Sequence, residues 1–485
     1  MRITLHDYVT DPHLPQKDGV NLAHENIAAM MKAYIGEKLD VAFHDFNRLL
    51  ADESYALEVL ANTDCVISNV GPHAHYYFYL RERYRLTYRI FRDVRTAIWS
   101  SYLLQEHLCA PYLRAEDVLM VASHYTRGLY EKIFPHLRSH ACFRCYPLAV
   151  NFPEELPARR ERGFDEPFIL GYIGRLSEDK NFPDLVSLLI GLNSDRPGHF
   201  KLVACGDIHS ASCRPELIQS RVRKALGDGD YFEYLPSRRN EDIWELLRRF
   251  DVMLFPSTSN LETFGRVLVE ASYAGLPVIC GAHAAAPELM PESSLCPVDY
   301  RFDESFSTHY DHCMGIINIR HMAEAVTSGK LQLPDCHRDF LRHPEKFISA
   351  LSMSAPEINR LDPLAMKSVQ RRLIESIDVD LPPALDLDAA NAAIDLLIPW
   401  FSGLQQKGTA ARQALVSRLT EMSAHPDRTW RYLDKSEKTR GDFTNVGGID
   451  IELCHVVGFY PTFLMPSNNT GRYHPDSVAI MEPSA

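Results

Sequence analysis

Residues 255–279 constrain the fold more than any other part of the chain. The segment reads as a strand, a polar loop, a glycine at a helix start, a helix, a glycine stop and a second strand. This order predicts a βαβ unit of a parallel sheet. The helix would begin beyond the carboxyl end of the first strand, so its free backbone N–H groups would form a site for a diphosphate. Gly265 would let the anion approach the backbone closely.

Two glutamates belong to this segment. Glu270 lies on the apolar helix, where a carboxylate is costly unless it is hydrogen-bonded. The vicinal hydroxyls of a ribose would satisfy it, and the alternative is an ion-paired helix residue. Glu262 lies on the preceding loop, where it could reach a sugar attached to the diphosphate, and the alternative is a capping or solvent-exposed residue. The glycines and flanking strands favour the binding interpretation for both glutamates.

A second segment, residues 171–183, carries two cations on a loop. A strand ends at Ile173, and Pro183 stands at a good position for the first turn of a helix. Arg175 and Lys180 therefore lie at the carboxyl edge of the same predicted sheet. An arginine can bind a leaving diphosphate through two hydrogen bonds, and a lysine acts as a point charge. The alternative is a pair of solvated loop cations.

The alternation of short apolar runs and helical patterns extends over two parts of the chain, residues 1–150 and 165–300. A linker rich in proline and charge separates them. We therefore predict an α/β fold with two domains, each a parallel sheet covered by helices, which suits a chain of 485 residues. A helical continuation follows over 301–430 and an atypical tail over 431–485. Helical patterns within the continuation lie near residues 316–328, 338–352, 364–376 and 388–424.

Composition argues against several classes of protein. A formal net charge of −13 repels polyanions, so we expect no nucleic-acid partner. No apolar run approaches the roughly 18 residues that a membrane helix needs, and the first residues do not resemble a signal peptide. The 11 scattered cysteines suggest reduced thiols. Cys142 and Cys145 form one Cys-x-x-Cys, but no second pair at metal-ligand spacing follows, which favours an inert buried pair over a redox or zinc role. We expect a cytoplasmic protein, peripheral to a membrane at most.

Residues 76–102 interleave aromatic side chains with arginines. Such a stretch could form an acceptor-binding cleft, a patch for an anionic membrane or a platform for single-stranded nucleic acid. The remaining interpretation is a buried helix face whose arginines extend outward to solvent.

The two cation- and glutamate-bearing segments together resemble the retaining glycosyltransferases of family 4. Glu262 and Glu270 match the family's Glu-x7-Glu motif. Gly-Arg-Leu-Ser-x-x-Lys at residues 174–180 matches its Gly-Arg-Leu-x-x-x-Lys signature, and Ala-Pro-Glu-Leu at 286–289 is similar to its Pro-Glu-Leu/Ile loop. These enzymes have the GT-B fold, in which a cleft separates two Rossmann-like domains.

The resemblance is looser in the N-terminal domain. Residues 116–123 are similar to the family's Ala-Asp-x-Val-x-x-x-Ser stretch, and residues 147–151 stand where the family has a hinge segment. The likeness covers roughly residues 1–300. GT-B chains usually return a C-terminal helix to the N-terminal domain, so it implies the same for part of residues 301–430.

The resemblance implies transfer of a hexose-type sugar, with retention, from a UDP- or GDP-sugar to a small-molecule, glycan, lipid or peptide acceptor. It implies an acceptor-side N-terminal domain and no metal or other cofactor. Glu262, Arg175 and Lys180 form the implied catalytic set. Arg175, Lys180 and the backbone N–H groups of Phe264, Gly265 and Arg266 would hold the diphosphate of the donor. Glu270 would hold the ribose, and Glu262 would hold the sugar.

Two departures from the family pattern stand in the N-terminal domain. The loop after the first strand holds only Gly19 where many relatives have a glycine pair that contacts the donor. The central strand lacks the family's histidine. Arg92 or Asp93 on that strand, or His73 or His75 before it, are the candidates to replace it.

These departures keep other functions open. One alternative is a catalytically inactive GT-B partner or regulatory protein. Another is a different GT-B enzyme, such as a phosphorylase or a sugar-nucleotide epimerase.

Overall fold

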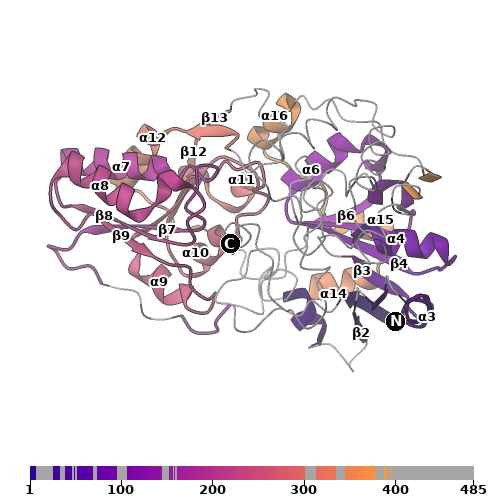
Figure 1. Ribbon diagram of the computed structural model, residues 1–485. Helices are drawn as coiled ribbons and strands as arrows, with labels where there is room; N and C mark the ends of the chain where they lie inside the picture. Colours follow the sequence, from indigo (N-terminus) through magenta and orange to yellow (C-terminus); the bar gives the residue numbers. More distant parts are fainter. Residues whose placement is uncertain are drawn as a thin grey trace, which may run out of the picture.

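A computed structural model gives the fold of the chain (Figure 1). The structure describes residues 1–6, 26–32, 39–45, 48–49, 52–68, 74–95, 106, 108–144, 152–156, 158, 161–300, 313–334, 345–377, 387–388, 390–391 and 394.

Six parallel strands form the first sheet, in the order β2-β1-β3-β4-β5-β6. We call this sheet and its helices the first lobe. Strands β3 and β5 are buried along their whole length, as expected for strands whose two faces are both covered. The strands are β1 (Arg2–His6), β2 (Asp40–His44), β3 (Cys65–Ser68), β4 (Arg89–Val94), β5 (Val118–Val121) and β6 (Ala141–Arg144).

A second six-stranded parallel sheet, in the order β12-β11-β10-β7-β8-β9, forms the second lobe with its helices. Figure 1 shows the two lobes side by side. The predicted α/β fold with two parallel sheets is therefore confirmed. The strands are β7 (Phe168–Ile173), β8 (Phe200–Cys205), β9 (Phe232–Leu235), β10 (Val252–Phe255), β11 (Val278–Gly281) and β12 (Leu295–Cys296).

The helices of the two lobes pack their apolar sides against these sheets. In the first lobe they are α3 (Glu53–Leu60), α4 (Ala74–Arg83) and α6 (His124–Ile133). In the second lobe they are α7 (Phe182–Asp195), α8 (Pro215–Leu226), α9 (Ile243–Arg249), α10 (Arg266–Tyr273), α11 (Ala286–Leu289) and α12 (Ile319–Thr327). Single turns of 3-10 helix lie at Ala110–Tyr112, Pro135–Leu137, Ala211–Cys213 and Glu292–Ser294.

One predicted helix begins later than the sequence pattern suggested. Residues 316 and 317 belong to strand β14 (Gly315–Ile317), which pairs antiparallel with β13 (Val298–Tyr300). Asn318 follows, and its side chain accepts a hydrogen bond from the backbone N–H of His321 at the start of α12. Asn318 is therefore the N-cap, and α12 begins after it, because its side chain satisfies a backbone N–H group that has no partner within the helix.

Three helices after residue 340 pack on the first lobe. They are α14 (Glu345–Ser352), α15 (Ala355–Leu361) and α16 (Ser368–Ser376). Phe347, Leu351 and Ile358 enter the core cluster that contains β1 and β3. Strand β6 contacts α15, and α6 contacts α16. The chain therefore crosses back to the first lobe after completing the second.

The aromatic stretch at residues 76–102 is internal where the structure describes it. Four consecutive aromatic residues of α4, Tyr76–Tyr79, are buried in the core of the first lobe. The interpretations that need these rings exposed are therefore wrong for α4. The expectation that its arginines extend outward is also wrong for Arg81, which is fully buried.

Arg81 is buried because Asp117 pairs with it. The guanidinium donates two hydrogen bonds of 2.7 Å to the two carboxylate oxygens. The same carboxylate accepts from the backbone N–H groups of Ile90 and Arg114, so one buried charge pair joins α4, β4 and the turn before β5. Removing one partner of such a buried pair destabilises the fold, because the other charge is left buried without a counter-charge.

We predict that Asp117→Asn lowers the free energy of unfolding by about 3–5 kcal/mol, because it leaves the Arg81 guanidinium buried without a counter-charge. Urea unfolding followed by circular dichroism measures the change. Glu241→Gln is the matched control, because it removes one partner of the exposed ion pair Arg239–Glu241 and should leave stability unchanged within error. Equal losses in the two variants would contradict the prediction.

Candidate functional site

The sheet order brings the two chemically important segments together. Strand β10 lies next to β7 in the second sheet, and both end at the same edge. The loop after β7 carries Arg175 and Lys180, and the loop after β10 carries Glu262. As a result the Lys180 Nζ lies 2.8 Å from a carboxylate oxygen of Glu262, although 82 residues separate them in sequence.

Glu262 is held as a carboxylate in a largely buried place. Its side chain is 14% exposed, and Ser257 donates it a hydrogen bond of 3.0 Å. Burial alone would raise the pKa of this carboxyl. The Lys180 ammonium and the hydrogen bonds from Lys180 and Ser257 outweigh burial and hold the pKa below its usual value. Glu262 is therefore ionised at neutral pH.

A second ion pair lies beside the first. Arg175 donates to Asp179 at 3.0 Å, and Asp179 is nearly buried. Burial would raise the pKa of Asp179, but the charges of Lys180 and Arg175 outweigh it and lower the pKa. Two cations and two carboxylates thus balance each other at this edge. A dianion that binds at this edge would replace the two carboxylates as the partner of Lys180 and Arg175.

Helix α10 begins at this edge with its N-terminus uncapped. Gly265 precedes it with a φ of 75°, a conformation that glycine adopts readily. A Cβ there would lie 2.9 Å from the Cδ1 of Leu268. Within the described residues no side chain caps this helix start. A helix start without a side-chain cap is suited to bind an anion, and binding of a diphosphate by the backbone of Phe264, Gly265 and Arg266 stays a prediction.

Glu270 is buried and already hydrogen-bonded. One of its oxygens, Oε1, accepts from Arg266 Nε at 2.6 Å and from Asn240 Nδ2 at 3.1 Å. Arg266 also donates to Asn240 Oδ1 at 3.2 Å, which closes a triangle of side chains. The ion-paired arrangement considered from the sequence is present, and binding of a ribose by Glu270 stays a prediction.

The structure places the first-lobe candidates for donor contacts in different environments. His75 lies on α4 and is fully buried, and burial followed by the charge of Arg92 lowers its pKa to about 3. Arg92 forms a buried ion pair with Glu106. Asp93 forms a buried pair of 2.7 Å with Arg95. Gly19 and His73 fall outside the described residues.

The first lobe contacts the Glu262 loop at the carboxyl end of β4. The hydroxyl of Thr263 donates to the backbone oxygen of Arg95 at 2.7 Å, and Ser123 Oγ donates to the backbone oxygen of Thr263 at 3.1 Å. Thr263 follows Glu262 directly in the chain. The carboxyl ends of β4 and β5 therefore lie against the loop that carries Glu262.

Two residues of the site were not recognised from the sequence. The Asn181 amide donates to the backbone oxygens of Pro256 and Gly315 and to the Thr258 hydroxyl, so it ties the lysine loop to the glutamate loop. His283 follows β11 at the same sheet edge. Position after a parallel strand was the available signal for His283, whereas the partners of Asn181 are distant in sequence.

His283 lies between two polar partners. Its Nε2 is 3.0 Å from the backbone oxygen of Ser259, and its Nδ1 is 3.2 Å from the Tyr300 hydroxyl. Burial lowers its pKa from 6.5 to about 4, which outweighs the opposite effect of Ser259 and Glu262. The ring is therefore neutral at pH 7 and sets the geometry of the loop without adding charge.

The part of the chain that the structure describes contains no group of three or more His, Cys, Asp or Glu side chains placed to hold a metal ion. No helix in that part is both long and apolar enough to cross a membrane. A metal-independent reaction and a cytoplasmic location both stay predictions.

Comparison with known proteins adds to this geometry. The family model described as Glycosyl transferases group 1 matches residues 156–294. The second lobe is similar to a glycosyltransferase domain. The matched residues hold both ion pairs, the start of α10 and Glu270, so the family match and the site geometry concern the same part of the molecule.

Curated relatives match over the same limited length. The D-inositol 3-phosphate glycosyltransferase of Stackebrandtia nassauensis is 31% identical over 134 residues, which are 27% of this chain and 30% of the relative. The Mycolicibacterium smegmatis protein of the same name is 32% identical over 119 residues, or 24% and 26% of the two chains. This chain therefore matches less than a third of the length of these relatives.

Solved structures match over more of the chain at lower identity. The Anabaena protein HepE in complex with UDP has a TM-score of 0.47 and 14% identity, covering 82% of this chain and 99% of that one. The lipopolysaccharide outer core galactosyltransferase WaaB has a TM-score of 0.48 and 16% identity, covering 72% and 99%.

The depressed pKa of His283 predicts a pH dependence of stability. Between pH 6.5 and about 4 the unfolded chain binds a proton at this histidine that the folded chain does not, so stability falls as pH falls through this window and levels off below it. From pH 7 to pH 5 the wild type should lose about 2 kcal/mol more than His283→Gln. Urea unfolding at the two pH values measures this difference. The same pH dependence in both proteins would contradict it.

Proposed function

We propose that the chain is a retaining glycosyltransferase of family 4 with a GT-B arrangement, which transfers a hexose-type sugar from a UDP- or GDP-sugar to an acceptor. The observation that carries the proposal is the convergence of Lys180, Arg175 and Glu262 at the uncapped start of α10. A nucleotide sugar has one dianionic diphosphate and one polyhydroxylated ring, and this arrangement offers cations and backbone N–H groups to the first and a carboxylate to the second.

Binding of the donor requires a rearrangement of the first ion pair. Lys180 would turn from Glu262 to the diphosphate, where it and Arg175 neutralise two negative charges. Glu262 would exchange its lysine contact for sugar hydroxyls, which can donate hydrogen bonds to a carboxylate. Glu270 would bind the ribose while Arg266 and Asn240 keep its carboxylate in place.

The chemical step needs little from a protein base. The bond between the anomeric carbon and the β-phosphate oxygen breaks, and a bond from the acceptor oxygen forms on the same face of the sugar. The acceptor proton passes to the departing phosphate oxygen. The protein contributes by holding the two substrates in place and by stabilising the charge of the leaving diphosphate. We propose that Arg175, Lys180 and the α10 start supply this stabilisation without a metal.

The matches support the donor side of the proposal more than the acceptor side. The family match, at residues 156–294, covers the part of the second lobe that holds the proposed donor residues. The acceptor would meet the first lobe.

A non-catalytic GT-B protein is the second candidate. The observation in its favour is that Arg92 and Asp93, two candidates for the absent family histidine, are both buried in ion pairs of the first lobe. Such a protein would bind a nucleotide or a nucleotide sugar without transferring or hydrolysing the sugar.

The test begins with thermal stabilisation by UDP, GDP and ADP and continues with turnover of the sugar form of whichever nucleotide binds. A ligand at 100 times its dissociation constant should add about 2.7 kcal/mol of stability.

We predict that Glu262→Ala and Lys180→Ala each lower the turnover rate at least about a hundredfold, because each deletes a charge that contacts the donor in the transition state.

Circular dichroism controls for folding of both variants. Near-normal turnover in the two variants would refute the site assignment, and nucleotide binding without any turnover would favour the non-catalytic candidate.

A further inference from the structure

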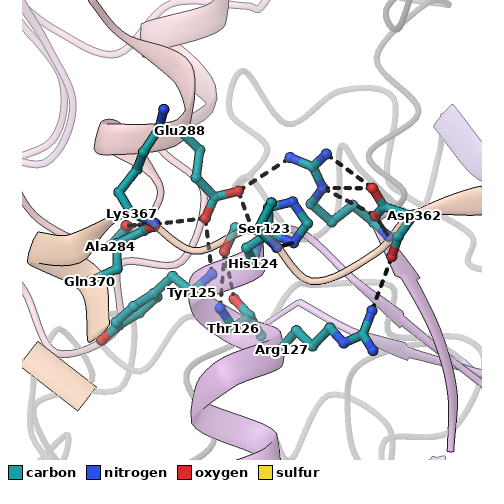
Figure 2. A network of polar contacts seen from close by, with 12 residues as sticks. Ser123, His124, Tyr125, Thr126, Arg127, Ala284, Glu288, Asp362, Lys367 and Gln370 are labelled. Atoms are coloured by element: carbon teal, nitrogen blue, oxygen red, sulfur yellow. Dashed lines mark hydrogen bonds and ion pairs between the residues drawn. The ribbon is translucent and has the colours of Figure 1, made fainter. Parts of the chain in front are cut away.

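Glu288 joins the second lobe to the start of α6 in the first lobe (Figure 2). Its two carboxylate oxygens accept hydrogen bonds of 2.9 Å from the backbone N–H groups of His124 and Tyr125. The side chain is 4% exposed. A carboxylate is stabilised at a helix N-terminus by the free donors and by the helix dipole. Glu288 thus caps a helix of the other lobe.

Two further donors complete the environment of this carboxylate. Gln370 of α16 donates to Oε1 at 2.7 Å and to the backbone oxygen of Ala284 at 2.8 Å. Arg144 at the end of β6 donates to Oε2 at 3.3 Å and is itself paired with Asp362. The returning C-terminal segment therefore takes part in the same contact, as Figure 2 shows.

The same turn of α6 also contacts the loop at residues 257–265, which carries Glu262. Ser123, the N-cap of α6, accepts from the N–H of Thr126 and donates to the backbone oxygen of Thr263. Thr263 follows Glu262. Two separate parts of the second lobe, α11 and the loop before α10, thus dock on one turn of the first lobe. Separating the lobes would break these hydrogen bonds and expose the groups that make them to water, so the geometry of the contacts favours one docked arrangement.

We propose that Glu288 is a positioning residue that acts on Glu262 through this turn. By fixing the α6 start against α11, it fixes Ser123 against Thr263, and so sets the place of Glu262 relative to the first lobe. Removing it should loosen the loop at residues 257–265 without removing any group that would bind the nucleotide. This inference rests on the proposed function for its catalytic consequence, although the coupling itself does not.

Hydrogen exchange measured by mass spectrometry tests the coupling on the full-length chain. Glu288→Gln keeps the size of the side chain but replaces one acceptor oxygen with an amide that faces donors. We expect exchange in residues 257–265 to rise about tenfold. Thr263→Val, which removes the hydroxyl bound to Arg95, should give a similar rise.

Lys132→Met is the matched control. Lys132 lies at the other end of α6 and donates to the backbone oxygens of Ile374 and Ile377, so it ties α6 to the same C-terminal segment at a distance from the turn that contacts Glu288. Exchange in residues 257–265 should not change in this variant. An unchanged rate in Glu288→Gln, or an equal rise in Lys132→Met, would overturn the proposal.

Kinetics separate this inference from the proposed function. The substrate is the nucleotide sugar that corresponds to the nucleotide bound by the wild type. Relative to the wild type, Glu288→Gln should lower kcat about tenfold and leave the affinity for UDP or GDP within about twofold. Parallel loss of kcat and affinity would indicate a merely structural role and overturn the inference. Failure of the wild type to bind either nucleotide would count against the proposed function, while the exchange experiment would still decide the coupling.

Discussion

The ion pair between Lys180 and Glu262 depends on the neighbouring positions of β7 and β10, and the rest of the site is arranged around it. It joins the loops that follow these two strands, and Asn181 reinforces the junction through its amide. The charges of Lys180 and Arg175 also lower the pKa of Asp179. Such a site is suited to bind an anion, because ion pairs hold both cations in place and Lys180 is largely shielded from water.

The two lobes contribute unequally to this arrangement. The second lobe holds the cations, Glu262 and the uncapped start of α10, all within the part that matches a glycosyltransferase family. The first lobe contributes the turn at the start of α6, which contacts both the Glu262 loop and Glu288. The contacts that dock the two lobes and those that hold the Glu262 loop therefore lie within a few residues of each other.

The sequence predicted the two sheets and the juxtaposition of Arg175, Lys180 and Glu262 because those signals are local. Each strand is a short apolar run, and parallel strands end at a common edge. The sequence could not predict which individual side chains pair over long distances in the chain, and the Lys180–Glu262 ion pair is one such contact. Nothing near Glu288 indicates that its partners are His124 and Tyr125, more than 160 residues away. The aromatic residues of α4 could not be placed because burial of Arg81 depends on Asp117, 36 residues along the chain.

A crystal structure with the nucleoside diphosphate that binds most tightly would test the central claim most directly. The account predicts the diphosphate at the start of α10, within hydrogen-bond distance of the backbone N–H groups near Gly265, with Lys180 turned away from Glu262 to contact it. A diphosphate bound elsewhere, with the Lys180–Glu262 pair intact at 2.8 Å as in the free protein, would contradict the account.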